Sequence, residues 1–157
     1  FRSQKAVTIA IADSQVREKL NAKLVQDNIE IINVIANNAL QYDNITMGKG
    51  SIICGFVHLT SNIKIGKGFH ANIYSYIAHD CVIGDFVTFA PRVSCNGNVH
   101  IEDHAYIGTG AVLRQGTPDK PLIIGKGAIV GMGAVVTKDV PAGVTVVGNP
   151  ARPLIKN

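Results

Sequence analysis

The chain has 157 residues, and because 46% of them are hydrophobic and only 17% are charged, it can bury a core and is not intrinsically disordered. The formal net charge is +4, but the 15 Lys and Arg residues are scattered without a basic cluster, which argues against a nucleic-acid-binding protein. We expect a cytoplasmic protein with reduced thiols and no membrane span, since the sequence contains no apolar run of about 18 residues, no signal-peptide pattern and no metal-type spacing among its cysteines.

The first 43 residues read as a strand–helix–strand unit. The apolar run 6–11 predicts a strand, Asp13 or Ser14 can cap a following helix, and the run 29–35 predicts a second strand. Apolar side chains recur on one face of that helix, at Val16, Leu20 and Leu24. Such a unit normally belongs to a larger parallel sheet, so residues 1–43 are expected to be the remnant of a Rossmann-like α/β domain. Alternatively, the unit caps the open end of the repeats that follow.

From Met47 onward the sequence repeats every six residues. An apolar lead residue recurs at each sixth position as far as Leu113, and the repeat resumes at Ile124 and continues to Val136. A helix cannot use this period, because six residues turn it through about 1.67 turns and scatter the apolar side chains. A β-solenoid of short strands and tight turns fits it, with the lead residues stacked inside, so we predict one over residues 44–157. The alternative is a β-sandwich with coincidental spacing.

Residues 114–121 interrupt the repeat with Gly, two Pro and charged side chains, which predicts a surface loop. Because loops on a rigid repeat scaffold often carry binding groups, we expect this one to reach a neighbouring subunit or a bound cofactor.

One of the five histidines, His79, has the setting of a general base. It lies in a turn two residues after a lead position, and the carboxylate of Asp80 follows it. A neighbouring carboxylate can fix the tautomer of an imidazole and stabilise its protonated form. The other four are expected to be exposed surface residues: His58, His70, His100 and His104.

A family resemblance follows from these hexapeptides together with the segment 124–152 (IGKGAIVGMGAVVTKDVPAGVTVVGNPAR), which resemble the left-handed parallel β-helix acyltransferases. Within them, the runs 79–86 (HDCVIGDF) and 95–99 (CNGNV) are similar to the NeuD/PglD group of bacterial surface-glycan synthesis. The resemblance implies a left-handed hand for the solenoid and a nucleotide-sugar-binding role for residues 1–43. It also implies a homotrimer with a site at each subunit boundary.

The same resemblance implies an acetyl-CoA-dependent acetyltransferase that N-acetylates a UDP-linked 4-amino sugar. O-acetylation of a sugar of the sialic acid type is the alternative, and a non-catalytic scaffold is a third. The family's glycine-rich nucleotide turn is absent here, and Ala12 stands where relatives have Gly, so the sugar-nucleotide pocket is expected to be incomplete or altered.

The resemblance also assigns site residues. Three hexapeptides form one coil in that family, so Gly97 lies one rung from His79; the two match the oxyanion-site glycine and the base, and Asp80 matches the acidic partner. Asn72 matches a sugar-contacting position, and Thr88 stands where relatives often have a second histidine, so these two are the candidate substrate-binding residues. The candidate cofactor-binding residues are Gly108, Gly110, Gly131, Gly133, Lys138, Pro150, Ala151 and Arg152, although Lys138 and Arg152 could equally be solvated surface charges.

A metal site is not favoured by the histidine spacing. Some left-handed β-helices are zinc-dependent carbonic anhydrases, and zinc needs about three imidazoles at close range. No two histidines of this chain share a position within an 18-residue coil, so we expect no catalytic metal.

Overall fold

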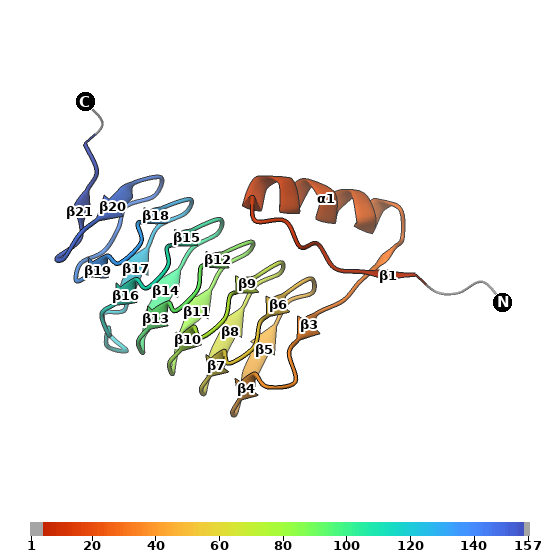
Figure 1. Ribbon diagram of the computed structural model, residues 1–157, viewed down its shortest axis with the longest axis horizontal. Coiled ribbons are helices and arrows are strands. Elements are labelled where there is room, and N and C mark those ends of the chain that lie inside the picture. The colour runs from red at the N-terminus through yellow and green to blue at the C-terminus, as the bar shows by residue number, and fades with distance from the viewer. Residues whose placement is uncertain (1–4, 156–157) are drawn as a thin grey trace.

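The computed structural model describes residues 5–155 and shows a parallel β-solenoid of about six turns with a strand–helix–strand unit on its flank (Figure 1). The solenoid is a three-sided prism, because each coil contributes one short strand to each of three parallel sheets. The predicted β-solenoid with its N-terminal βαβ unit is therefore confirmed.

Each face of the prism is one of these sheets. The first face contains β3 (Val34–Ile35), β6 (Ile52–Ile53), β9 (His70–Ala71), β12 (Thr88–Phe89), β15 (Tyr106–Ile107), β18 (Ile129–Val130), β20 (Thr145–Val147) and the antiparallel β21 (Arg152–Pro153). The second face contains β4 (Leu40–Gln41), β7 (His58–Leu59), β10 (Tyr76–Ile77), β13 (Ser94–Cys95), β16 (Val112–Leu113) and β19 (Val135–Val136). The third face contains β5 (Ile45–Met47), β8 (Ile63–Ile65), β11 (Val82–Ile83), β14 (Val99–Ile101) and β17 (Leu122–Ile124).

The six-residue period places one buried side chain in each strand. In β10, for example, Tyr76 faces outward and Ile77 is fully buried, and Ile77 pairs with Leu59 and Cys95 of the adjacent coils. Stacking these lead residues gives one continuous apolar core along the prism. The turns between strands use left-handed backbone at many non-glycine residues, including Asn62 and Asp80. Asn and Asp tolerate that conformation better than other side-chain-bearing residues.

The predicted loop leaves the solenoid between the second and third faces. Strand pairing advances by 18 residues from coil to coil until β14, where Val99 pairs with Leu122, so five additional residues lie in the connection. Residues 114–120 are exposed apart from Gly116, and Thr117 bridges to Lys120. The prediction of a surface loop is thus confirmed, while its role in binding is not tested by the fold.

The N-terminal unit has the expected capped helix, but its strands differ from the sequence-based expectation. Its helix α1 (Ser14–Gln26) is capped by Asp13, whose carboxylate accepts the N–H groups of two first-turn residues. Its strands β1 (Ala6–Val7) and β2 (Glu30–Ile31) are short, since the predicted second strand is divided and its last residues form β3 of the solenoid. Parallel pairing with the coils therefore begins at Val34, ahead of the residue 43/44 boundary.

The helix packs through an arginine rather than through its full apolar stripe. Val16 is 43% exposed, whereas Arg17 is buried against the prism. Its guanidinium donates hydrogen bonds to the carbonyls of Gly68 and Phe86 and to the Thr88 hydroxyl at 2.9 Å. Burial lowers the pKa of Arg17 to about 10, an effect that the nearby Asp13 carboxylate partly offsets. The expected apolar face was wrong at Val16, because carbonyl acceptors at this edge favour a donor.

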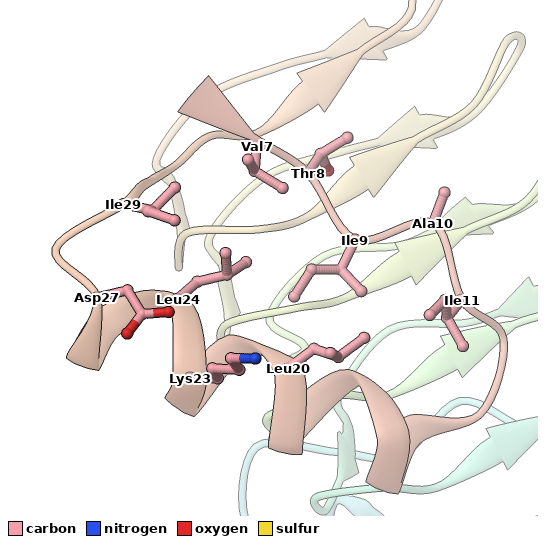
Figure 2. Close-up of a pocket in the computed structure, with 10 residues that line it drawn as sticks. All are labelled: Val7, Thr8, Ile9, Ala10, Ile11, Leu20, Lys23, Leu24, Asp27 and Ile29. Atoms are coloured by element: carbon pink, nitrogen blue, oxygen red, sulfur yellow. The ribbon is translucent and has the colours of Figure 1, made fainter. Parts of the chain in front are cut away.

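An open apolar pocket of about 490 Å³ separates α1 from the segment that follows β1 (Figure 2). Leu20 and Leu24 of the helix face Ile9 and Ile29 across it, with Lys23 and Asp27 at its rim. The two-stranded sheet of β1 and β2 is therefore only partly covered by α1.

Candidate active site

The candidate base lies in the turn between the second and third faces, which we call the catalytic edge (residues 78–81 and the equivalent turns of other coils). His79 Nδ1 is 2.7 Å from Asp80 Oδ2, and both side chains are about half exposed. The left-handed backbone of Asp80 (φ 58°) brings these two sequence neighbours to the same side of the turn. With its proton on Nδ1, the imidazole donates to Asp80 and leaves Nε2 free to accept a proton.

A ladder of amides supports the carboxylate from the preceding coils. Asn62 lies 18 residues before Asp80 and donates to its Oδ1 at 3.2 Å, while Asn44 donates to Asn62 Oδ1 at 3.1 Å. Hydrogen bonds from His79 and from Asn62 hold the pKa of Asp80 below its usual range, so the carboxylate stays ionised. Sequence reasoning missed Asn62, although its 18-residue spacing from Asp80 was visible.

Gly97 lies directly against the imidazole, one rung along the prism. A Cβ placed on Gly97 would stand 2.6 Å from both Cε1 and Nε2 of His79, closer than real side chains approach. Only glycine therefore leaves Nε2 facing an open backbone. The loop of residues 114–121 also contacts Gly97, since the Gly116 N–H donates to the Gly97 carbonyl at 2.9 Å. The sequence-derived pairing of His79 with Gly97 is present in the fold.

The phosphate-binding candidate Lys138 shares the catalytic edge. It follows the lead residue of β19 by two positions, as His79 follows that of β10, and the second face orders these strands β10, β13, β16, β19. Three rungs of about 4.8 Å place Lys138 roughly 14 Å along the axis from His79. Lys138, Ala151 and Arg152 line one pocket of about 210 Å³ at the C-terminal end of the prism. Pro150 lies in the adjoining turn, which returns the chain to β21.

The glycines proposed for cofactor binding lie along the other edge of the second face. A Cβ on Gly108 would meet the backbone of Gly131 and Met132 at 2.6–2.8 Å, and one on Gly131 would meet Val147 at 2.7 Å. Gly110 and Gly133 instead adopt positive φ with open space around them. Coil packing and turn geometry thus account for all four glycines without a ligand, and a role in CoA binding stays a prediction.

The two substrate candidates also lie away from the catalytic edge of the same chain. Asn72 is exposed in a turn between the first and second faces, and Thr88 is buried on the first face beneath Arg17. Both line a pocket of about 300 Å³ with His70 and Ala12. No hydrogen bond joins either of them to His79 or Asp80 within residues 5–155. The second face of the prism separates Asn72 and Thr88 from His79 and Asp80.

Of the four histidines expected to be exposed, His58 is exposed, whereas His70, His100 and His104 are at least half-buried. The His104 side chain is only 8% exposed, stacks on Phe86, and has Nε2 3.3 Å from a Glu18 carboxylate oxygen on α1. His70 is half-buried with Nε2 unpaired, and burial together with the Arg17 charge lowers its pKa to about 4. The N-terminal unit lies against both side chains, with Glu18 of the helix at His104 and the segment containing Ala10 and Ala12 at His70, which the repeat alone could not indicate.

Within residues 5–155, no group of three His, Cys, Asp or Glu side chains is arranged to hold a metal ion. None of the helices in that part of the chain is suited to crossing a membrane.

Comparison with known proteins identifies relatives over almost the full chain. No family model matches the sequence. The GDP-perosamine N-acetyltransferase of Escherichia coli O157:H7 is 55% identical over 149 residues, which are 95% of this chain and 67% of the relative. The structure of WeeI from Acinetobacter baumannii AYE is 71% identical with a TM-score of 0.96, over 98% of this chain and 73% of that one.

A third relative was solved with ligands bound. PerB from Caulobacter crescentus, in complex with CoA and GDP-perosamine, is 27% identical with a TM-score of 0.90, over 96% of this chain and 70% of that one. The fold, the repeat and these similarities agree with the family inferred from the hexapeptides. The chain belongs to the hexapeptide-repeat β-helix sugar N-acetyltransferases, the acetyl-CoA-dependent enzymes of the group that contains WeeI and PerB.

Proposed function

We propose that this chain transfers the acetyl group of acetyl-CoA to the amine of a nucleotide-linked amino sugar for surface-glycan synthesis. The observation that carries the proposal is the imidazole Nε2 of His79 facing the bare backbone of Gly97, with Asp80 fixing the ring from the other side. GDP-perosamine is the first acceptor to test, since the relative from E. coli is a GDP-perosamine N-acetyltransferase. A UDP-linked 4-amino sugar, the acceptor predicted from the sequence, is the second.

In the proposed reaction the sugar amine attacks the thioester carbon, and His79 Nε2 removes the proton that the nitrogen loses as the C–N bond forms. Asp80 stabilises the resulting imidazolium through its bond to Nδ1. The Gly97 N–H binds the oxyanion of the tetrahedral intermediate. As the intermediate collapses to the amide, the C–S bond breaks and the His79 imidazolium returns its proton to the CoA sulfur, which leaves as the thiol. Removing one such donor typically lowers kcat by about 10²–10³.

The cofactor is proposed to lie along the prism with its phosphates at the C-terminal end. Lys138 stands on the same edge as His79, roughly three rungs of about 4.8 Å away, and Arg152 adds a second cation beside it. The second wall of this slot would come from the other edge of a neighbouring subunit, where Asn72, Gly108 and Gly131 lie. This is the reason to expect a homotrimer, which light scattering coupled to gel filtration tests directly.

Thiol release from acetyl-CoA, measured with GDP-perosamine and with a panel of UDP-4-amino sugars, tests the proposed function. Acetylated product should appear by mass spectrometry with at least one acceptor and should vanish in His79→Ala. The ratio of kcat/KM values for GDP- and UDP-linked acceptors then determines the nucleotide. Absence of thiol release with every amino sugar, from protein that binds acetyl-CoA, would contradict the assignment.

A further inference from the structure

The direction of the Gly97 N–H is set by the peptide bond that joins it to Asn96. In a trans peptide the N–H and the C=O point in opposite directions, and the cis peptide among the described residues is Asn149–Pro150. The Gly97 N–H donates to no acceptor within residues 5–155. It is therefore free to bind an oxyanion, provided that the Asn96 carbonyl stays turned inward.

A thiol holds that carbonyl from inside the prism. Cys81 is fully buried, and its Sγ donates to the Asn96 carbonyl oxygen at 3.2 Å. The carbonyls at the same place in the two preceding coils, those of Thr60 and Ala78, accept no hydrogen bond in the described part of the chain. The inward thiol bond thus occurs at the rung that carries Gly97 and not at those before it.

The column in which Cys81 stands is otherwise apolar. The residues 18 positions before and after it are Ile63 and Val99, both fully buried. A branched aliphatic side chain would therefore fill this position without disturbing the prism. Packing alone gives no reason for a thiol here.

The side chain of Asn96 is held separately. It accepts a hydrogen bond from Tyr76 Oη at 2.8 Å and donates to the Leu113 carbonyl at 2.7 Å. The thiol of the second cysteine of this corner, Cys95, is a longer donor to the same Asn96 carbonyl oxygen, at 3.8 Å against 3.2 Å for Cys81. The Asn96 side chain is therefore held independently of the backbone carbonyl that Cys81 contacts.

Building on the proposed function, we propose that Cys81 is a positioning residue, whose S–H holds the Asn96 carbonyl inward and so directs the Gly97 N–H outward to the thioester. Glycine follows this carbonyl, whereas Ser61 and His79 follow the equivalent carbonyls of Thr60 and Ala78. Because no side chain restrains the Asn96–Gly97 peptide, loss of the thiol would let it rotate its oxygen toward water and its N–H away from the substrate. Cys81 is not a nucleophile in this scheme, because its sulfur faces the interior.

Two substitutions separate positioning from packing. Cys81→Val removes the thiol donor but matches the aliphatic residues of its column, so the protein should keep its melting temperature. Its kcat should fall by about tenfold or more, while the KM for acetyl-CoA stays within about twofold of the wild-type value. Cys81→Ser keeps a donor but loses volume, so it should be less stable yet retain more of the wild-type kcat. If Cys81 served only packing, Cys81→Val would instead retain more of the wild-type kcat than Cys81→Ser. Val99→Ala, which removes bulk next to this position, should lower stability without lowering kcat.

A crystal structure of Cys81→Val distinguishes failure of this proposal from failure of the proposed function. The expected result is an Asn96–Gly97 peptide rotated relative to wild type. If wild type acetylates no sugar, the proposed function fails while this comparison still decides the role of Cys81. An unrotated peptide in Cys81→Val, or wild-type kcat in that variant, would overturn the inference.

Discussion

A single methyl group on Gly97 should separate catalysis from stability. Gly97 does not lie in the positive-φ region, so alanine adds no backbone strain, but its Cβ would stand 2.6 Å from His79 Nε2 and 3.1 Å from Cδ2. Carbon atoms need about 3.5 Å, so the half-exposed imidazole must move by nearly 1 Å. That movement stretches its 2.7 Å bond to Asp80 and displaces Nε2 from the acceptor amine.

We expect Gly97→Ala to change the free energy of unfolding by less than about 1 kcal/mol, as for a partly exposed site. Turnover should fall by about 10² or more, because misplacing a catalytic group by 1 Å has that effect. Gly55→Ala is the matched control, since its Cβ would meet the end of the Asn38 side chain at 2.9 Å in another turn. Thiol release and thermal melts measure both variants. A kcat within about threefold of wild type in Gly97→Ala would refute the His79–Gly97 site.

Three further predictions concern other parts of the molecule. His79→Ala should lower kcat by about 10²–10⁴ with an unchanged melt, as expected for loss of a general base, and near-normal turnover would remove it from the mechanism. Deleting residues 117–121 restores the 18-residue step and should weaken acetyl-CoA binding in calorimetry, whereas unchanged affinity would show that the loop does not contact the cofactor. Because the folded pKa of His70 is about 4 and its ordinary value 6.5, the unfolded state binds more protons between these values, so stability is full above pH 6.5 and falls as pH drops toward 4. Melting temperatures at neutral and mildly acidic pH should differ less in His70→Gln than in wild type, and an equal difference would contradict the shift.

The sequence alone was sufficient for the solenoid, because its signal is local and repeated. Each lead residue from Met47 onward must be apolar to enter the core, and a six-residue step is incompatible with a helix. Once the coil length was taken from the family, the adjacency of His79 and Gly97 followed by counting, since one coil of 18 residues brings the same turn back one rung later. The hand of the coil was not available from residue physics, and it was inferred from the family resemblance alone.

Contacts between elements with no common period were decided only by the tertiary structure. Arg17 replaced Val16 as the buried residue of α1 because the carbonyls of Gly68 and Phe86 lie beneath it, more than 50 residues along the chain. The same packing buried His104. Periodicity reports which residues face inward within one repeating element, but it carries no information on the surface that a separate helix covers.

Within the candidate site, the sequence indicated the candidate residues, and the tertiary structure decided how their side chains are oriented and on which edge of the prism each one lies. Asp80 was identified as the partner of His79, yet the Asn62 bond to its second oxygen and the Cys81 bond to the Asn96 carbonyl depend on distances across rungs. Asn72 and the late glycines were grouped with His79 by resemblance, but the prism places them on another edge. Residue type and spacing indicate in which coil of the solenoid a residue lies. The direction of a peptide N–H and the edge from which a side chain projects depend instead on how the three-sided coil closes.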